Sequence, residues 1–560
     1  ESLRSGGLDF ATATSSSFPP THLINLVLPN ILGTDIDQNY WGYFLGYISQ
    51  IESGIYVGIL PLILALGTVR DFKRSQVLAL LVVAVCALVL ALGRFTPAFR
   101  IVYALPGISS FRIPARMLIL FCFALSILAG LGTSRVQSKC QDRSWLRRLA
   151  LAFSGLGIFF LLLGLIARLG NPGLTALAEA LARAVYASAA GGRTRSVDYA
   201  LGIVQQVMPT LPNQFVFPAI ILLLAGGVLV AFRRTPRFAL TLLGIIIAFD
   251  LAWFSWRYLV VVPVSEIIRP GQKKMLAYLD ASPERARIYA EDTLLPTNMG
   301  NVFGFANVQS GFPQVSKRYR DLINCGLESS DAVLDLGFFK QFNARALQLL
   351  NAATAFTLKP VESSDWKTVA QENVQIIAYD HARSDYPVPQ RVMAYVSKSI
   401  NALPRAFVVY DAQVIADDAA TLQTIYRSDF DPARQVVLDQ PVGALGPVPA
   451  SPALAQMQKY APNQFALLAT TDTPGILVLS EIFAPGWSAT VDGKSVPVLR
   501  ANYTLRAVYL SAGTHRVEFD YVPPGLATGL GITIGTGLGV VVVGAALIRR
   551  RSAREQGAKR

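Results

Sequence analysis

Two arginines that stand four residues apart are the first candidates for chemistry in this sequence. Arg112 and Arg116 lie in the segment FRIPAR, immediately before a long apolar run. A guanidinium group is planar, bonds phosphate through two parallel hydrogen bonds and keeps its charge at any accessible pH. The pair could therefore bind a phosphate group at a membrane surface. Alternatively, both side chains only extend from the end of a membrane helix toward the lipid headgroups.

Carboxylates that precede the first apolar run form a second group of candidates. Glu52 stands at the start of that run, and Asp37 lies in the preceding loop, close to Tyr40 and Trp41. Such carboxylates could take a proton from an acceptor hydroxyl or bind a divalent cation. A carboxylate about to enter a membrane needs a partner or a function, whereas Asp35 is better explained by a local turn. Glu52 and Asp37 are therefore the candidate catalytic residues, and Tyr40 and Trp41 join the two arginines as candidate substrate-binding residues.

A third acid, Asp250, lies inside an apolar run. Acids within a membrane are functional candidates, for example in proton transport. No second acid, histidine or lysine in another apolar run would complete a proton relay. We therefore favour a hydrogen bond between helices as the role of Asp250.

These candidates are distributed over a chain with the composition of a membrane protein. Its 560 residues are 52% hydrophobic and 15% charged, whereas a soluble domain carries about 25% charged residues. Seven segments approach the roughly 20 apolar residues that cross a bilayer: 54–69, 76–93, 117–133, 149–167, 215–232, 238–256 and 525–548. The sequence therefore predicts a helical bundle over residues 54–256, with about six helices, and one further membrane helix near the C-terminus.

The net charge of +14 indicates how these segments are oriented. Four short stretches, 70–75, 134–148, 233–237 and 549–560, hold 17 Lys and Arg but three acids, so they account for the whole net charge. Basic residues concentrate in cytoplasmic loops, which predicts a cytoplasmic tail at 549–560. The opposite side then holds residues 1–53, the loop 94–116, an interfacial loop at 168–214 and the large segment 257–524. The remaining sequence is neutral, so the charge does not indicate nucleic-acid binding.

The segment 257–524 divides into two parts by its pattern. Residues 257–390 mix helical stretches with loops, which predicts a mixed α/β region. Residues 391–524 contain short alternating runs separated by turns, which predicts an antiparallel β-sandwich, with a type I′ hairpin at Asp492-Gly493. Aromatic and polar side chains in this part could form a sugar-binding face, although packing of the sandwich is the favoured explanation; they are Trp487, Tyr503, Arg506 and His515.

Several stretches resemble the YfhO-like family of bacterial multi-pass membrane proteins. The resemblance is carried by NYWGYF with IESGIYVGILPLILAL (Asn39 to Leu66), by ALPGISSFRIPARMLILFCFALSILAGLG (Ala104 to Gly132), and by the run from SEIFAPGWSATVDGK to HRVEFDYVPPG (Ser480 to Gly525). It covers most of the chain, in order.

This resemblance implies a fold and an activity. Members of the family are similar to GT-C type glycosyltransferases, membrane enzymes that take a sugar from a polyprenyl-phosphate carrier and pass it to an envelope polymer such as a teichoic acid. In that architecture the principal catalytic acid lies in the first extracytoplasmic loop, which we expect upstream of Glu1, in a missing N-terminal part of the bundle. The expected protein is a multi-pass enzyme of the bacterial cytoplasmic membrane, its large domain outside, with a divalent cation as a conceivable cofactor. The alternative is a non-enzymatic envelope scaffold or glycan-binding protein.

Overall fold

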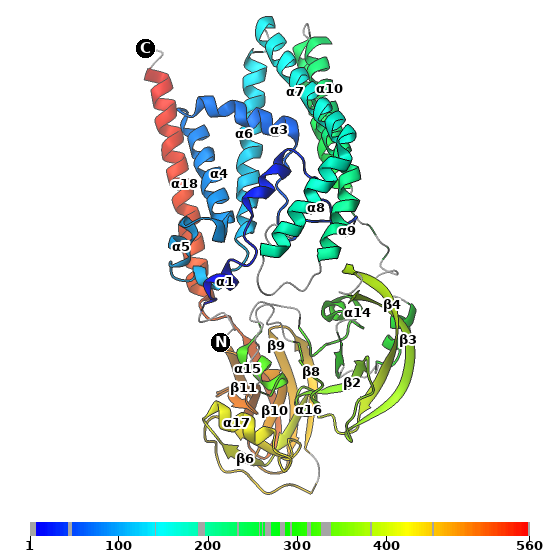
Figure 1. Cartoon of the computed structure of the whole chain (residues 1–560). Helices are drawn as coiled ribbons and strands as arrows, with labels where there is room; N and C mark the ends of the chain where they lie inside the picture. The colour runs from blue at the N-terminus through cyan, green and yellow to red at the C-terminus, as the bar shows by residue number, and fades with distance from the viewer. Residues whose placement is uncertain are drawn as a thin grey trace. The chain divides into compact units, whose positions relative to one another are not determined.

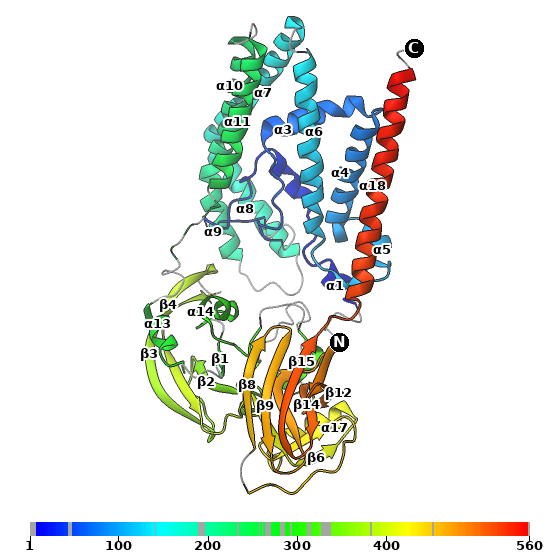
Figure 2. The ribbon, with the colours of Figure 1, turned by 180° about the vertical axis from the view of Figure 1, so that it is seen from behind.

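The computed structural model describes residues 7–37, 39–42, 48–139, 142–188, 197–231, 235–256, 258–259, 261, 263, 270–279, 286–291, 294–310, 315–325, 338–380, 384–450 and 453–557. These residues fall into two compact units. The helical unit comprises residues 4–267 and 377–390, and the strand-rich unit comprises residues 1–3, 268–376 and 391–560. Figures 1 and 2 show both units from opposite sides.

Five described helices are long and apolar enough to cross a membrane. Their shared feature is a length of 20 or more residues, about the number that spans the hydrocarbon core, with a strongly apolar stretch of 18 residues inside each helix. They are α6 (Leu118–Lys139), α7 (Arg143–Leu169), α10 (Leu211–Ala231), α11 (Pro236–Trp256) and α18 (Leu526–Gly557). The prediction of a polytopic helical membrane protein is therefore confirmed, and the tail after Gly557 lies outside the described residues.

The first two apolar segments form shorter helices than the sequence predicts. Residues 54–69 contain only α3 (Ile59–Thr68), whose 10 residues extend about 15 Å, half of a hydrocarbon core. The backbone before it is not helical, because Gly58 has a φ of +92°. The second segment forms α4 (Ser75–Ala91), with 17 residues, which is at the lower limit for a membrane span.

Asp250 explains why α3 begins where it does. The Asp250 side chain on α11 is fully buried; one carboxylate oxygen accepts a hydrogen bond from the Tyr56 hydroxyl at 2.7 Å and the other accepts one from the Ile59 amide at 3.1 Å. The carboxylate thus satisfies a free amide at the N-terminus of α3. The predicted hydrogen bond between helical segments is confirmed for this residue.

Small residues let the helices of the helical unit approach closely. A methyl group added to Gly132 on α6 would stand 2.4 Å from the Leu64 carbonyl oxygen on α3, and one added to Gly157 on α7 would stand 3.1 Å from the Ala219 carbonyl oxygen on α10. Figures 1 and 2 both show α7 and α10 side by side. Close backbone contact at small residues is the usual basis of helix association in lipid, where the hydrophobic effect does not draw helices together.

The strand-rich unit contains three sheets. A four-stranded sheet has the order β1-β2-β4-β3, a six-stranded sheet has the order β5-β10-β14-β13-β7-β6, and a five-stranded sheet has the order β12-β11-β15-β9-β8. The strands are β1 (Arg287–Ala290), β2 (Ala352–Thr357), β3 (Trp366–Asp380), β4 (Ser384–Ser399), β5 (Ala406–Val409), β6 (Asp411–Val414), β7 (Gln435–Leu438), β8 (Leu454–Ala461), β9 (Gln464–Thr471), β10 (Gly475–Ile482), β11 (Trp487–Val491), β12 (Lys494–Val496), β13 (Leu499–Ala501), β14 (Leu505–Leu510) and β15 (Gly513–Tyr521). The strand-rich C-terminal region is therefore confirmed.

The two larger sheets share an apolar core. It combines side chains from the six-stranded sheet, such as Leu477 and Val508, with side chains from the five-stranded sheet, such as Leu467 and Phe519. The hairpin between β11 and β12 has positive φ at Asp492 (51°) and Gly493 (75°), as a type I′ turn requires. One boundary differs from the sequence pattern, because the run after residue 391 belongs to β4 and pairs with β2 in the four-stranded sheet.

Candidate functional site

The structure joins two of the predicted site residues in an ion pair. The Arg116 guanidinium lies 3.1 Å from the Glu52 carboxylate, and the two side chains are 64% and 24% exposed. A second ion pair, between Arg135 and Asp71, has a distance of 2.7 Å. Arg116 and Arg135 stand 19 positions apart along α6 and the turn before it, which is about 28 Å of helix. The two pairs therefore mark the two ends of a segment about as long as the hydrocarbon core is thick.

The segment that carries Arg112 and Arg116 has a strained backbone. Ile113, between them, has a φ of +70° and a ψ of +71°, a region that β-branched residues strongly avoid. The turn is held by burial of Pro114 and Ala115 and by a hydrogen bond from the Ala115 amide to the Ser16 carbonyl oxygen at 3.3 Å. Strain of this kind persists where the surrounding structure fixes it, and it is common at functional sites.

A buried chain of polar groups lies behind Glu52. The Tyr40 hydroxyl is 3.0 Å from His22 Nε2 and 3.0 Å from the hydroxyl of Ser53, the neighbour of Glu52 in sequence. Tyr40 is 3% exposed, and His22 and Ser53 are fully buried. Tyr40 therefore connects His22 in the N-terminal loop to Ser53, the residue after Glu52.

Burial lowers the pKa of His22 to about 4, so the imidazole is neutral at pH 7. In the unfolded chain the same group has a pKa near 6.5. Between these two values the unfolded state binds the proton and the folded state does not, so stability is lost as pH falls from about 6.5 toward 4. For a difference of this size, the loss at pH 4 is about 3 kcal/mol.

We expect His22→Gln to remove this part of the pH dependence, because an amide can bond Tyr40 without titrating. The measurement is the melting temperature of the detergent-solubilised chain between pH 7.5 and pH 4.5. Wild type should lose more stability than the variant over this range. Parallel curves for the two proteins would contradict a neutral, buried His22.

Asp37 and Trp41 make hydrogen bonds within the N-terminal loop. The Asp37 carboxylate accepts a hydrogen bond from the Thr34 hydroxyl at 2.7 Å, which is a local turn contact. The Trp41 indole donates to the Ile31 carbonyl oxygen at 3.3 Å and packs on a small apolar cluster around Val204. Arg112 is half-buried in the turn before α6.

A divalent cation does not fit these carboxylates. Glu52 faces Arg116, and Asp37 belongs to a separate turn. Within the described part of the chain, no three His, Cys, Asp or Glu side chains gather as ligands of a metal ion would.

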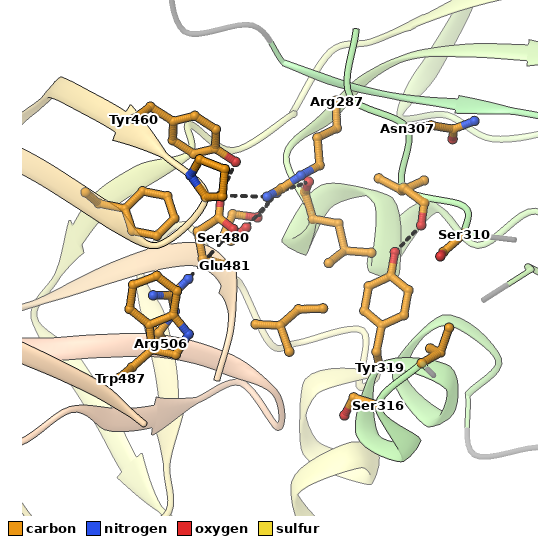
Figure 3. Close-up of a pocket in the computed structure, with 16 residues that line it drawn as sticks. Arg287, Asn307, Ser310, Ser316, Tyr319, Tyr460, Ser480, Glu481, Trp487 and Arg506 are labelled. Carbon is orange, nitrogen blue, oxygen red and sulfur yellow. Dashed lines mark hydrogen bonds and ion pairs between the residues drawn. The ribbon is translucent and has the colours of Figure 1, made fainter. Parts of the chain in front are cut away.

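The strand-rich unit holds a pocket that the sequence pattern did not predict. Its volume is about 500 Å³. Its walls come from β1, from β8 to β11 with the turn after β8, from β14, from the helix α15 (Lys317–Ile323) and from residues 307–310 and 315–316. Figure 3 shows Arg506 against the ring of Trp487 in one wall, with Asn307 and Ser310 in another. The size lies within the range of about 300–1,000 Å³ that small-molecule sites occupy.

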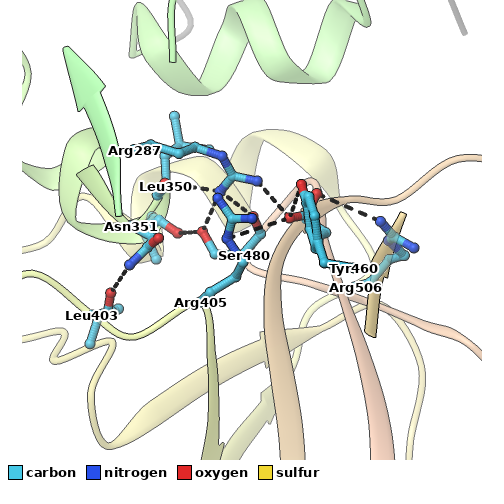
Figure 4. Close-up of polar contacts among 10 residues, drawn as sticks. Arg287, Leu350, Asn351, Leu403, Arg405, Tyr460, Ser480 and Arg506 are labelled. Carbon is cyan, nitrogen blue, oxygen red and sulfur yellow. Dashed lines mark hydrogen bonds and ion pairs between the residues drawn. The ribbon is translucent and has the colours of Figure 1, made fainter. Parts of the chain in front are cut away.

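Three arginines converge on one carboxylate beside this pocket. Glu481 lies 2.7 Å from Arg287, 3.9 Å from Arg405 and 3.8 Å from Arg506. Figure 4 shows the polar contacts of this arginine cluster, which include hydrogen bonds from Arg287 to the carbonyl oxygens of Leu350 and Ser480. The pairing register of β10 with β14 shifts between Leu479 and Ile482. Glu481 lies within this irregular stretch. A bulge changes the direction in which the side chains of a strand point.

The charges of the cluster are unequally compensated. Burial lowers the pKa of Arg506 to about 10, and it also lowers the pKa of Arg405. Burial is also the largest single influence on Arg287, but the charge and hydrogen bond of Glu481, together with Tyr460 and Tyr319, outweigh it, and the pKa of Arg287 is raised. Glu481 therefore neutralises chiefly Arg287, while Arg506 stays charged at neutral pH with little compensation.

About half of the polar side chains that line the pocket lie in one continuous segment, from β8 to the start of α18. Residues 454–533 match the protein family described as bacterial membrane protein YfhO. Over that segment the chain is similar to this family of bacterial membrane proteins. No curated protein and no solved structure matches it. The YfhO match includes Tyr460, Glu481, Trp487 and Arg506, whereas the resemblances in the helical unit lie outside the matched residues.

Residues 454–533 also include the four side chains that the sequence offered as a sugar-binding face. Of the four side chains considered for a sugar-binding face, Trp487 and Arg506 line the pocket. Tyr503 is 5% exposed and donates to Asp321 at 3.2 Å, and His515 is bonded to Asp492 at 2.7 Å, so both have structural partners. His22, Arg287 and Glu481 were missed, because a single polar residue in a loop or strand carries no periodic signal.

Proposed function

We propose that this protein is a membrane glycosyltransferase that moves a sugar from a polyprenyl-phosphate carrier to a cell-envelope polymer or glycan. The observation that carries the proposal is the ion pair of Arg116 with Glu52 at one end of α6. It couples a phosphate-binding side chain to a carboxylate able to accept a proton. The strained turn at Ile113 supports the same assignment.

The ion pair suggests how donor binding prepares the reaction. A donor phosphate at Arg112 and Arg116 competes with Glu52 for the Arg116 guanidinium, which is accessible at 64% exposure. Once released, the Glu52 carboxylate is free to take the proton of an acceptor hydroxyl. The hydroxyl oxygen forms the bond to the sugar C1, the bond from C1 to the phosphate oxygen breaks, and the polyprenyl phosphate leaves with the electron pair.

The remaining assignments belong to the same proposal. Tyr40 holds the backbone at Glu52 through Ser53, and Trp41 and Asp37 lie in the loop before it, where an acceptor would approach. The Glu52 end of α6 faces the outside of the bacterial cytoplasmic membrane, the strand-rich unit is extracytoplasmic, and its two larger sheets form the β-sandwich. The basic residues near the opposite end of α6, such as Arg135 and Lys139, support this orientation.

Replacing Arg116 tests the phosphate role. Arg116→Ala should lower kcat/KM for the lipid donor about 10- to 100-fold, as loss of one charge-assisted contact does. The kcat/KM of Arg116→Lys should lie between the values for wild type and Arg116→Ala, because lysine keeps the charge but lacks the planar guanidinium group. The measurement is transfer of labelled sugar from a polyprenyl-phosphate donor in membranes that contain equal amounts of each protein.

Arg135→Ala is the matched control, since it breaks the other ion pair of α6 away from the proposed site. It should leave transfer per molecule near the wild-type value. Equal transfer by wild type and Arg116→Ala, or equal losses in both alanine variants, would count against a phosphate site at Arg116. No transfer by wild type would favour the alternative, an envelope protein that binds glycans without modifying them.

A further inference from the structure

Arg506 is a buried cation with unused hydrogen-bond donors beside a pocket. Its side chain is 2% exposed, and within the described residues neither its Nε nor its Nη1 atom has a hydrogen-bond partner. Its nearest acid, Glu481, is 3.8 Å away and is shared with Arg287 and Arg405. Buried donors without partners are costly, so a folded protein that keeps them has a use for them.

The aromatic surroundings hold the guanidinium in place. Its central carbon lies 3.8 Å from the centroid of the Trp487 ring, 5.0 Å from that of Phe465 and 5.7 Å from that of Phe519. Stacking on aromatic faces stabilises a cation, but it does not satisfy the N–H groups that lie in the plane of the guanidinium. The plane of Arg506 is thus fixed, while its Nε and Nη1 donors keep no partner among the described residues.

The charge of the pocket wall favours an anion. Three arginines and one glutamate make up the cluster, which is an excess of two positive charges. Of the residues that line the pocket, two are arginines and only Glu481 is acidic. The pKa of Arg506 is lowered because burial penalises its positive charge, and Glu481 offsets this effect only in part. An anion in the pocket would add the missing negative charge.

The rest of the wall suits a hydroxylated ring. Asn307 Nδ2 is a second buried donor that has no partner among the described residues. Ser316 and Tyr460 add polar groups, and Trp487 and Phe465 add aromatic surface. Neutral donors and aromatic faces together are what a sugar, with hydroxyl groups around an apolar ring, requires.

We propose that this pocket binds an acidic sugar, with the oxyanion on Arg506 and sugar hydroxyls on groups such as Asn307. The oxyanion is a carboxylate, as in a uronic acid, or a phosphate, as in a sugar phosphate. The site lies in the strand-rich unit and involves none of the residues assigned to transfer. Binding to it can therefore be measured without any transferase activity, and each proposal can fail alone.

The test is a ligand-observed NMR titration of the full chain in nanodiscs of neutral lipid. The probes are glucose, glucuronate and glucose 6-phosphate, which share one ring, together with inorganic phosphate. We expect glucuronate, glucose 6-phosphate or both to bind at least about tenfold more tightly than glucose. Tighter binding of glucuronate would identify the oxyanion as a carboxylate, and tighter binding of glucose 6-phosphate would identify it as a phosphate. Glucose binding equally well, no acidic sugar binding, or inorganic phosphate binding as tightly as glucose 6-phosphate would overturn the proposal.

Arg506→Met separates a binding role from a structural one. Methionine fills the aromatic surroundings, and it removes one of the two uncompensated charges, so the melting temperature should not fall while acidic-sugar binding drops about tenfold or more. Arg516→Met is the control, because Arg516 is exposed on β15 and pairs only with its neighbour Glu518 among the described residues. It should bind as wild type does.

Arg506→Lys keeps the test decisive if the methionine variant does not fold. Lysine retains the charge but not the planar donors. The affinity of the lysine variant for an acidic sugar should therefore lie between the affinities of wild type for that sugar and for glucose. Wild-type affinity in either Arg506 variant would overturn the assignment of the oxyanion to this residue.

Discussion

Glu481→Gln should lower the free energy of unfolding of this protein by about 3–5 kcal/mol, as removal of one partner from a buried ion pair does. The Glu481 and Arg287 side chains are 11% and 14% exposed, and their charged groups lie 2.7 Å apart. Glutamine keeps the shape but leaves three arginines without a negative charge between them. Arg405 and Arg506, at 9% and 2% exposure, cannot reach water to compensate.

The measurement is thermal or denaturant unfolding of the detergent-solubilised chain, followed by a signal from the strand-rich unit such as near-ultraviolet circular dichroism. Glu518→Gln is the control on a neighbouring sheet, because its partner Arg516 is 60% exposed. An exposed pair contributes about 1 kcal/mol or less. Similar losses in the two variants would show that the arginine cluster is not held by Glu481.

Glu52→Gln should lower the turnover number for sugar transfer about 10²- to 10⁴-fold, the usual contribution of a general base. A neutral glutamine competes less strongly than the carboxylate with a donor phosphate for Arg116, so donor binding should not weaken. A fall in kcat without a rise in KM is the result expected when the lost interaction acts in the transition state. A purely structural role for Glu52 would instead reduce the amount of folded protein in the membrane.

Asp71→Asn is the matched control for Glu52→Gln. Asp71 pairs with Arg135 at 2.7 Å and has a similar exposure, 25% compared with 24% for Glu52. It lies near the other end of α6, so its loss should leave turnover per molecule unchanged. Normal turnover in Glu52→Gln would assign the base to another carboxylate, and loss in both variants would attribute the effect to helix packing.

Local features of the sequence determined several parts of this protein. Runs of about 20 apolar residues predicted the helices that span a membrane, because only a helix satisfies its own backbone in lipid. The Asp492-Gly493 pair predicted the hairpin between β11 and β12, because both positions have the positive φ that this turn needs. The alternating runs predicted a strand-rich C-terminal region, because side chains of a strand point alternately to its two faces.

The sequence also indicated candidate residues without their partners. It marked Glu52 and Arg116 separately, each from its position at the start of an apolar run. They meet across 64 residues only because α3 packs on α6, with Gly132 allowing the close approach. Similarly, Asp250 was unusual in an apolar run, but its bonds to Tyr56 and Ile59 depend on how α11 packs on the start of α3.

The tertiary structure alone decided the arginine cluster and its pocket. Arg287, Arg405, Glu481 and Arg506 lie on or beside different strands, and nothing in their spacing links them. The bulge in β10 and the packing of the sheets bring these four residues together. Both depend on contacts between residues far apart in the sequence, which no local pattern encodes. Burial then decides their chemistry, because the same guanidinium that water would solvate on the surface becomes a fixed, under-compensated cation inside the strand-rich unit.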